Sequence, residues 1–174
     1  MQIEKLPISQ INSMPLAEFT SQFGGIFEHS PWIAERAAVK RPFASIDAML
    51  QAMWEVVSSV SAEQQMKLIR AHPDLVGRAA NQAEALTRES AGEQASAGLM
   101  QLSPDEINSF RQFNQQYRDQ FGFPFVICAR ENKKEAILAA FPTRLANSPD
   151  QERATALAEI RKIARLRLID RVSE

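Results

Sequence analysis

Residues 103–122, SPDEINSFRQFNQQYRDQFG, predict the clearest helix of the chain. Ser103 followed three residues later by Glu106 is the pattern of a capping box, and the proline between them suits the first helical position. Apolar and aromatic side chains then recur at steps of three and four as far as Tyr117, and Gly122 is a typical helix stop. The stretch therefore predicts an amphipathic helix with one buried side.

Similar helix starts recur along the chain. Ser45 precedes IDAMLQAMWEVV, Ser61 with Gln64 opens AEQQMKLIRA, and Ser148 with Gln151 opens the last helix. Weaker helical patterns cover residues 15–23, 31–38, 88–98 and 133–146.

One segment, FPFVICA at 123–129, looks extended, and a single short segment cannot build a sheet. We therefore expect an all-α fold: a single domain over residues 1–174, packed as an irregular bundle of about seven to eight helices with no significant sheet. The polar stretch from Gly77 to Arg88 is expected to be a loop.

Composition excludes several classes of protein. The chain has 174 residues and a formal net charge of −1, whereas nucleic-acid binders usually carry a basic excess. No apolar run approaches the roughly 20 residues that span a bilayer, and the N-terminus lacks the pattern of a signal peptide. The single cysteine cannot form an intrachain disulfide, and two histidines with one cysteine are too few for the usual zinc site. We expect a cytoplasmic protein that binds neither metal, nucleic acid nor membrane.

The first candidate for chemistry is His72, between Ala71 and Pro73. The helix that begins after Ser61 must end near this histidine because a proline follows. An imidazole placed there can titrate near neutral pH. The alternative is a histidine that only caps the helix C-terminus.

A second candidate is the polar group Ser90, Glu93 and Gln94. On a helix these residues fall at i, i+3 and i+4, so all three point to one side. A hydroxyl, a carboxylate and an amide together suit a polar, nitrogen-rich small molecule. The alternative is a solvated helix face capped by Thr87.

The apolar segment and the last helix supply further candidates. The stretch Phe125, Val126, Ile127, Cys128 and Ala129 could wall a pocket and offer backbone N–H groups to a ligand, or it could be a buried connector. Cys128 has no basic neighbour before Arg130, which favours a packed thiol over a nucleophile.

In the last helix, Arg167 lies between two leucines, so its guanidinium could be partly enclosed and aimed at an anion. Arg161 and Arg165 lie on the same predicted helix and stay open as alternatives.

Taken in order, these pieces resemble a known family. AHPDLVGR at 71–78, LTRESAGEQASAGL at 86–99, FNQQYRDQFGFPFVICAR at 113–130 and KIARLRL at 162–168 are similar to the decarboxylases of 2-oxo-4-hydroxy-4-carboxy-5-ureidoimidazoline, abbreviated OHCU. EHSPWIAERA at 28–37 fits the same family, so the resemblance spans almost the whole chain.

The resemblance implies a cofactor-free, usually dimeric enzyme of uric acid degradation that releases CO2 and forms (S)-allantoin. The catalytic histidine of the family falls on His72, with Pro73 beside the substrate and Glu93 holding the imidazole or the ureido N–H groups. The substrate-binding positions implied are Ser90, Gln94, Phe125, Val126, Ile127, Cys128, Ala129 and Arg167. A functional association with hydroxyisourate hydrolase, the preceding enzyme of that pathway, stays open.

Two alternatives come from other classes of protein. One is a hydrolase of a related ureide that uses His72 as a general base, which would release ammonia or urea rather than CO2. The sequence shows no metal set and no activated nucleophile for it. The other is a helical interaction module without activity, which predicts no enclosed pocket joining His72, Glu93 and Arg167.

Overall fold

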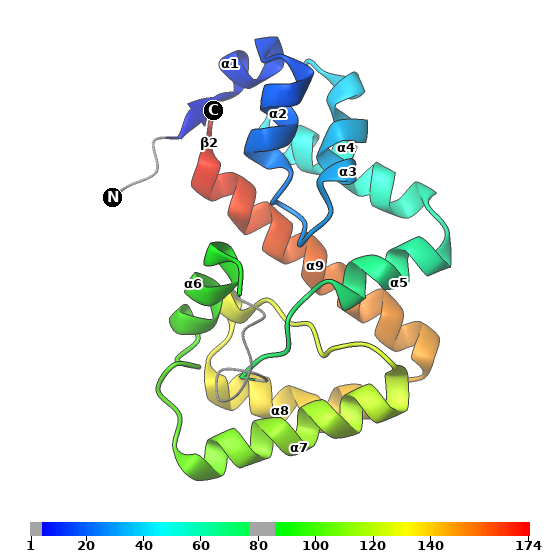
Figure 1. The fold of residues 1–174 in the computed structure, drawn as a ribbon, viewed down its shortest axis with the longest axis vertical. Helices are drawn as coiled ribbons and strands as arrows, with labels where there is room; N and C mark the ends of the chain where they lie inside the picture. The colour runs from blue at the N-terminus through cyan, green and yellow to red at the C-terminus, as the bar shows by residue number, and fades with distance from the viewer. Residues whose placement is uncertain (1–4, 77–85) are drawn as a thin grey trace. The chain divides into compact units, whose positions relative to one another are not determined.

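The structure, a computed structural model, describes residues 5–76 and 86–174 (Figure 1). The predicted loop from Gly77 to Arg88 lies outside the described residues up to position 85. The chain forms two compact units, one of Met1–Ala71 with Arg161–Glu174 and the other of His72–Ile160. The all-α class is confirmed, and the single domain over residues 1–174 stays a prediction.

The first unit contains short helices from the N-terminal half and the end of the last helix. Its elements are β1 (Leu6–Pro7), α1 (Ile8–Ser13), α2 (Leu16–Phe23), α3 (Pro31–Ala37), the 3-10 turn η1 (Ala38–Lys40), α4 (Ile46–Ser59), α5 (Ala62–Arg70) and β2 (Val172–Ser173). The second unit contains α6 (Arg88–Ser96), α7 (Pro104–Phe121), the 3-10 turn η2 (Ala129–Glu131), α8 (Lys134–Leu145) and the start of α9 (Pro149–Arg171).

Helices begin directly after the serines that were predicted to cap them. Ser45 accepts from the N–H of Ala48 at 3.0 Å and caps α4. At α7, Ser103 and Glu106 form the full capping box, and Gly122 ends the helix in the left-handed region at φ 74°. The predicted capping pattern is confirmed at these two helices.

Three local details differ from the sequence prediction. α1 and the pair β1–β2 were not predicted; the strands pair in parallel as Leu6 with Val172 and Pro7 with Ser173, so they join the two ends of the chain. Because the two strands lie far apart in the sequence, no local sequence pattern predicts that they pair. The segment predicted as extended ends at Cys128, because Ala129 begins η2.

The second unit has an aromatic core. Its fully buried rings are Phe110, Tyr117, Phe123, Phe125 and Phe141. Phe125 and Phe141 stack with centroids 3.9 Å apart, and Tyr117 meets Phe125 edge-on at 5.3 Å. These contacts fix the apolar segment after α7 against α7 and α8.

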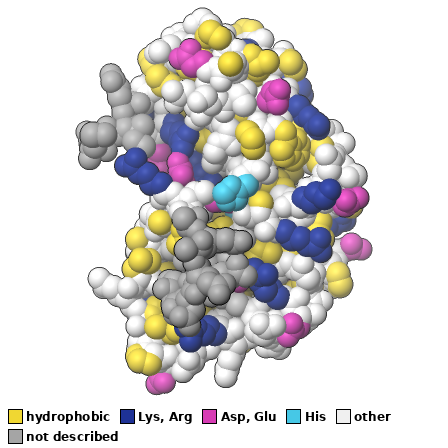
Figure 2. All heavy atoms as spheres, in the orientation of Figure 1, with side chains coloured by type: hydrophobic (Ala, Val, Ile, Leu, Met, Phe, Trp, Pro, Cys, Tyr) yellow, Lys and Arg dark blue, Asp and Glu magenta, His cyan; other side chains and the backbone are white. Residues whose placement is uncertain are grey.

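The surface carries both signs of charge. Basic and acidic side chains are interspersed over the face in Figure 2, in keeping with the formal net charge of −1. Within the described residues, no helix combines the length and the apolar character needed to cross a bilayer.

Candidate active site

His72 lies in a turn directly after α5. The helix ends at Arg70, with Ala71 as its C-cap, because the backbone before Pro73 disfavours helical conformation. The His72 side chain is buried, with 6% of its surface exposed. The prediction that the helix ends near His72 is confirmed, and the structure adds that this residue is buried.

Two side chains hold the turn that follows His72. The amide of Gln94 on α6 accepts from the N–H of Val76 at 3.3 Å and donates to the carbonyl of Asp74 at 3.4 Å. From α7, Asn114 donates to the carbonyl of Leu75 at 2.7 Å. Val76 has φ 60°, a left-handed conformation that is rare for a β-branched residue. The surrounding contacts therefore impose the path of the turn.

A partly exposed ion pair also holds this turn. Arg118 on α7 donates through Nε and Nη2 to the Asp74 carboxylate at 2.9 and 2.8 Å. Arg118 and Asn114 were not predicted to hold this turn, although both lie on α7, the helix with the clearest sequence pattern.

The prediction that Ser90, Glu93 and Gln94 share one side of α6 is partly confirmed. Thr87 caps the helix, accepting from the N–H of Ser90 at 3.2 Å and donating to its hydroxyl at 3.0 Å. Ser90 and Gln94 are buried, with 4% and 6% exposed, whereas Glu93 is half-buried. The alternative of a solvated helix face is therefore wrong for Ser90 and Gln94.

The apolar segment lies in the same unit as His72 and α6. Phe125, Val126, Cys128 and Ala129 are buried, and Ile127 is half-buried. α6 packs against η2, the turn that ends the segment. One expectation needs correction: the N–H of Cys128 is not open to a ligand, because it donates to Oε2 of Glu159 at 2.8 Å.

The surroundings of Cys128 make it a poor nucleophile. Burial raises the pKa of the thiol to about 11, and the negative charges of Glu131, Glu159 and Glu93 act in the same direction. The packed thiol predicted from the sequence agrees with this environment.

Arg167 lies in the first unit and is enclosed, with 3% of its surface exposed. Its guanidinium forms an ion pair with Glu28 at 3.0 Å and donates to the carbonyls of Gly25 and Ile26 at 3.3 and 3.4 Å. Arg165 instead binds Asp47 at an exposed position. Glu28 is a further residue that sequence reasoning missed, since its partner lies far along the chain.

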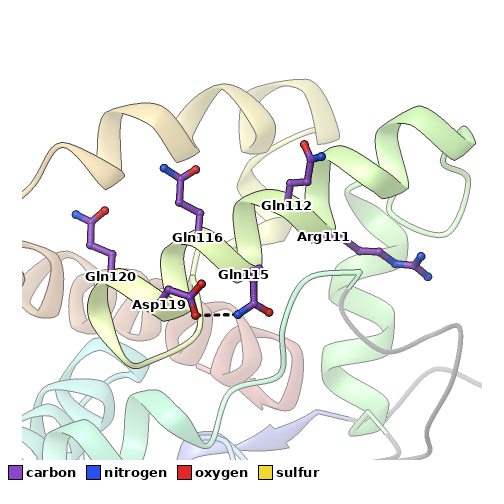
Figure 3. A pocket seen from close by; sticks show the side chains of 6 residues that line it. All are labelled: Arg111, Gln112, Gln115, Gln116, Asp119 and Gln120. Atoms are coloured by element: carbon purple, nitrogen blue, oxygen red, sulfur yellow. Dashed lines mark hydrogen bonds between the residues drawn. The ribbon is translucent and has the colours of Figure 1, made fainter.

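An open hollow of about 850 Å³ lies elsewhere in the second unit, along one face of α7. Figure 3 shows its side chains, which all come from this helix: Arg111, Gln112, Gln115, Gln116, Asp119 and Gln120. None of the predicted site residues lines it, so we interpret it as an exposed helix face. In the described ranges, no cluster of three or more His, Cys, Asp or Glu is arranged to hold a metal ion.

Comparison with known families decides the assignment. The family model described as OHCU decarboxylase matches residues 12–169, nearly the whole chain. This chain belongs to the OHCU decarboxylase family.

Two named proteins and a solved structure resemble this chain over most of its length. A 2-oxo-4-hydroxy-4-carboxy-5-ureidoimidazoline decarboxylase of Haloferax volcanii is 43% identical over 98% of this chain and 99% of its own length. A uric acid degradation bifunctional protein of a Bacillus species is 41% identical over 92% of this chain, which matches 31% of that longer protein. A crystal structure of (S)-allantoin synthase superimposes with a TM-score of 0.78 at 32% identity, covering 96% of this chain and 54% of the other.

Proposed function

We propose that this chain decarboxylates OHCU in uric acid degradation and forms (S)-allantoin and CO2. The observation that carries this proposal is the identity of 43% with a protein of that name over 98% of the chain. A match of that extent covers every candidate residue identified above.

The reaction breaks the bond between the ring carbon and its carboxylate. The electron pair stays on the ring, and a proton must then reach that carbon from one face to give a single enantiomer. We assign this proton transfer to His72, since histidine is the side chain that most often performs general acid–base work. Its burial supports the assignment, because a proton donor shielded from bulk water can supply one face of the ring with less competition from solvent.

Glu93 and the residues around it orient the reacting groups. In this proposal Glu93 holds the imidazole or accepts from the ureido N–H groups, while Ser90 and Pro73 contact the substrate. Gln94 contacts the substrate or acts through the turn, whose backbone its amide binds at two points.

The apolar segment and Arg167 handle the charged oxygens. Phe125 and Ile127 desolvate the carboxylate, which favours its loss. Arg167 binds an anionic oxygen of the substrate, and its pairing with Glu28 keeps that grip weak. A tight grip on the leaving carboxylate would stabilise the ground state and slow the reaction.

The test compares the two histidines of the chain. His72→Asn should lower kcat by about 10²–10⁴-fold, the usual contribution of general acid–base catalysis. His29→Asn is the matched control, since that side chain is 66% exposed. Substrate would be generated from urate in place and its decay followed by absorbance, with far-UV circular dichroism as a check of folding. Full turnover by folded His72→Asn would refute the assignment.

Four further expectations belong to this proposal. The chain acts as a homodimer, works in the cytoplasm as a single domain, and is functionally associated with hydroxyisourate hydrolase. The bifunctional uric acid degradation protein supports the last of these, since it joins a similar segment to other sequence in one chain.

A further inference from the structure

A buried charged network lies behind the apolar segment, and the mechanism above does not use it. Arg144 on α8 and Glu152 on α9 form an ion pair with 6% and 0% of their surfaces exposed. The hydroxyl of Tyr117 on α7 donates to Oε1 of Glu152, the oxygen that also pairs with Arg144. Asn147 donates to Oε2 of Glu152 at 2.9 Å. Three helices of the second unit thus meet at one carboxylate.

The network fixes the guanidinium of Arg144 in one place. Its Nε donates to Glu152, and its Nη2 lies 3.4 Å from the Tyr117 oxygen. The guanidinium also lies over the ring of Phe125, 4.3 Å from the centroid. Burial and the hydrogen bond to Glu152 raise the pKa of Tyr117 above its usual range, so its hydroxyl keeps the proton that it donates.

The remaining nitrogen of the Arg144 guanidinium binds the apolar segment. Nη1 of Arg144 donates to the carbonyl of Val126. The peptide bond between Val126 and Ile127 is trans, since the cis bond of the described chain is Arg41–Pro42. In a trans peptide the C=O and the N–H point in opposite directions. Binding the Val126 carbonyl therefore turns the N–H of Ile127 away from the guanidinium.

The Ile127 N–H is suited to a ligand. Among the described residues it has no hydrogen-bond acceptor, whereas the next N–H, of Cys128, donates to Glu159. Ile127 is also the half-buried residue in a run that is otherwise buried from Phe123 to Ala129. A backbone N–H is a strong donor that needs an acceptor, so an N–H without one among the described residues, at a half-buried position, is available to a substrate oxygen.

We propose that Arg144, held by Glu152 and Tyr117, is a positioning residue that directs the N–H of Ile127 toward the ring carbonyl shared by substrate and product. The inference rests on the proposed function for the identity of the ligand. A buried ion pair gives little net stability over apolar packing, so a role in fixing one backbone conformation accounts for its presence.

The test measures the Kd of (S)-allantoin by calorimetry, because a Kd does not depend on the fraction of inactive protein. Ile127→Pro removes the N–H at a position outside the helices, where no described backbone hydrogen bond of Ile127 is lost. Arg144→Lys keeps the charge opposite Glu152 but lacks the fork that reaches two partners at once. We expect each variant to weaken binding about tenfold, and the double variant to bind no more weakly than Ile127→Pro alone.

Two controls separate a loss of positioning from a general loss of stability. Ile11→Val shortens a fully buried side chain of α1, lowers stability, and should leave the Kd unchanged. If Arg144→Lys does not fold, Tyr117→Phe replaces it, with a smaller effect of about threefold and the same lack of additivity.

Wild-type Kd in folded Arg144→Lys or Tyr117→Phe, or effects that multiply with Ile127→Pro, would overturn the inference. Turnover of OHCU by the wild-type chain is measured separately, so failure of the proposed function is distinguishable.

Discussion

Cys128 shows how strongly the surroundings of one residue set its chemistry. Its thiol is buried at the end of the apolar segment, with three carboxylates acting on it. The pKa is raised to about 11 in the folded chain from an ordinary value of 9.0. Between these values the unfolded chain ionises at this position and the folded chain does not.

This difference predicts a loss of stability at alkaline pH. The contribution of Cys128 is fully present below about pH 9 and is lost as the pH rises through about 11. Urea unfolding of the wild type and of Cys128→Ala, at pH 8 and at pH 10.5, measures it. The free energy of unfolding should fall more steeply in the wild type. Equal slopes in the two proteins would show that the thiol titrates as in water.

Among the helices and turns, the turn after His72 has the largest influence on where the imidazole lies. Its backbone is bound by Gln94 from α6 and by Asn114 from α7, and it includes the left-handed Val76. Such a conformation persists only where neighbouring contacts impose it. The position of the imidazole therefore depends on two helices that come later in the chain.

Removal of the Gln94 amide tests this dependence. Gln94→Ala leaves the carbonyl of Asp74 and the N–H of Val76 without their partner, which should lower the free energy of unfolding by about 1–3 kcal/mol. Gln112→Ala on the exposed face of α7 is the matched control and should change it by less than about 0.5 kcal/mol. Urea unfolding at pH 7 compares both variants. A change in Gln94→Ala no larger than in the control would mean that the amide does not hold the turn.

Features encoded within a few residues were predictable, and those that join distant segments were not. The start of α7 was predicted because Ser103 and Glu106 act on the backbone beside them. The end of α5 was predicted because the proline after His72 does the same. The bond from Glu159 to the N–H of Cys128 spans 31 residues, and that from Arg144 to the Val126 carbonyl spans 18. A charged residue on a helix looks the same in the sequence whether it faces solvent or a buried carbonyl. These contacts to the backbone of the apolar segment were not predicted for that reason.

At the scale of the whole molecule, family membership adds what local patterns lack. The short motifs around His72, Glu93 and Phe125 occur in order within a match that covers residues 12–169. The helical pattern alone would fit many functions, since a fold does not determine an activity. The ordered motifs specify the reaction, and the structure adds the side chains that hold them.

The formation of a single enantiomer of allantoin distinguishes catalysis by this chain from spontaneous decay of OHCU. Urate oxidase and hydroxyisourate hydrolase would generate OHCU from urate in the presence of this protein, and circular dichroism would follow the allantoin formed. We expect a rapid signal of the (S) sign, because the proposed site delivers the proton to one face. A flat trace with folded protein, as expected for the racemic product of uncatalysed decay, would contradict it.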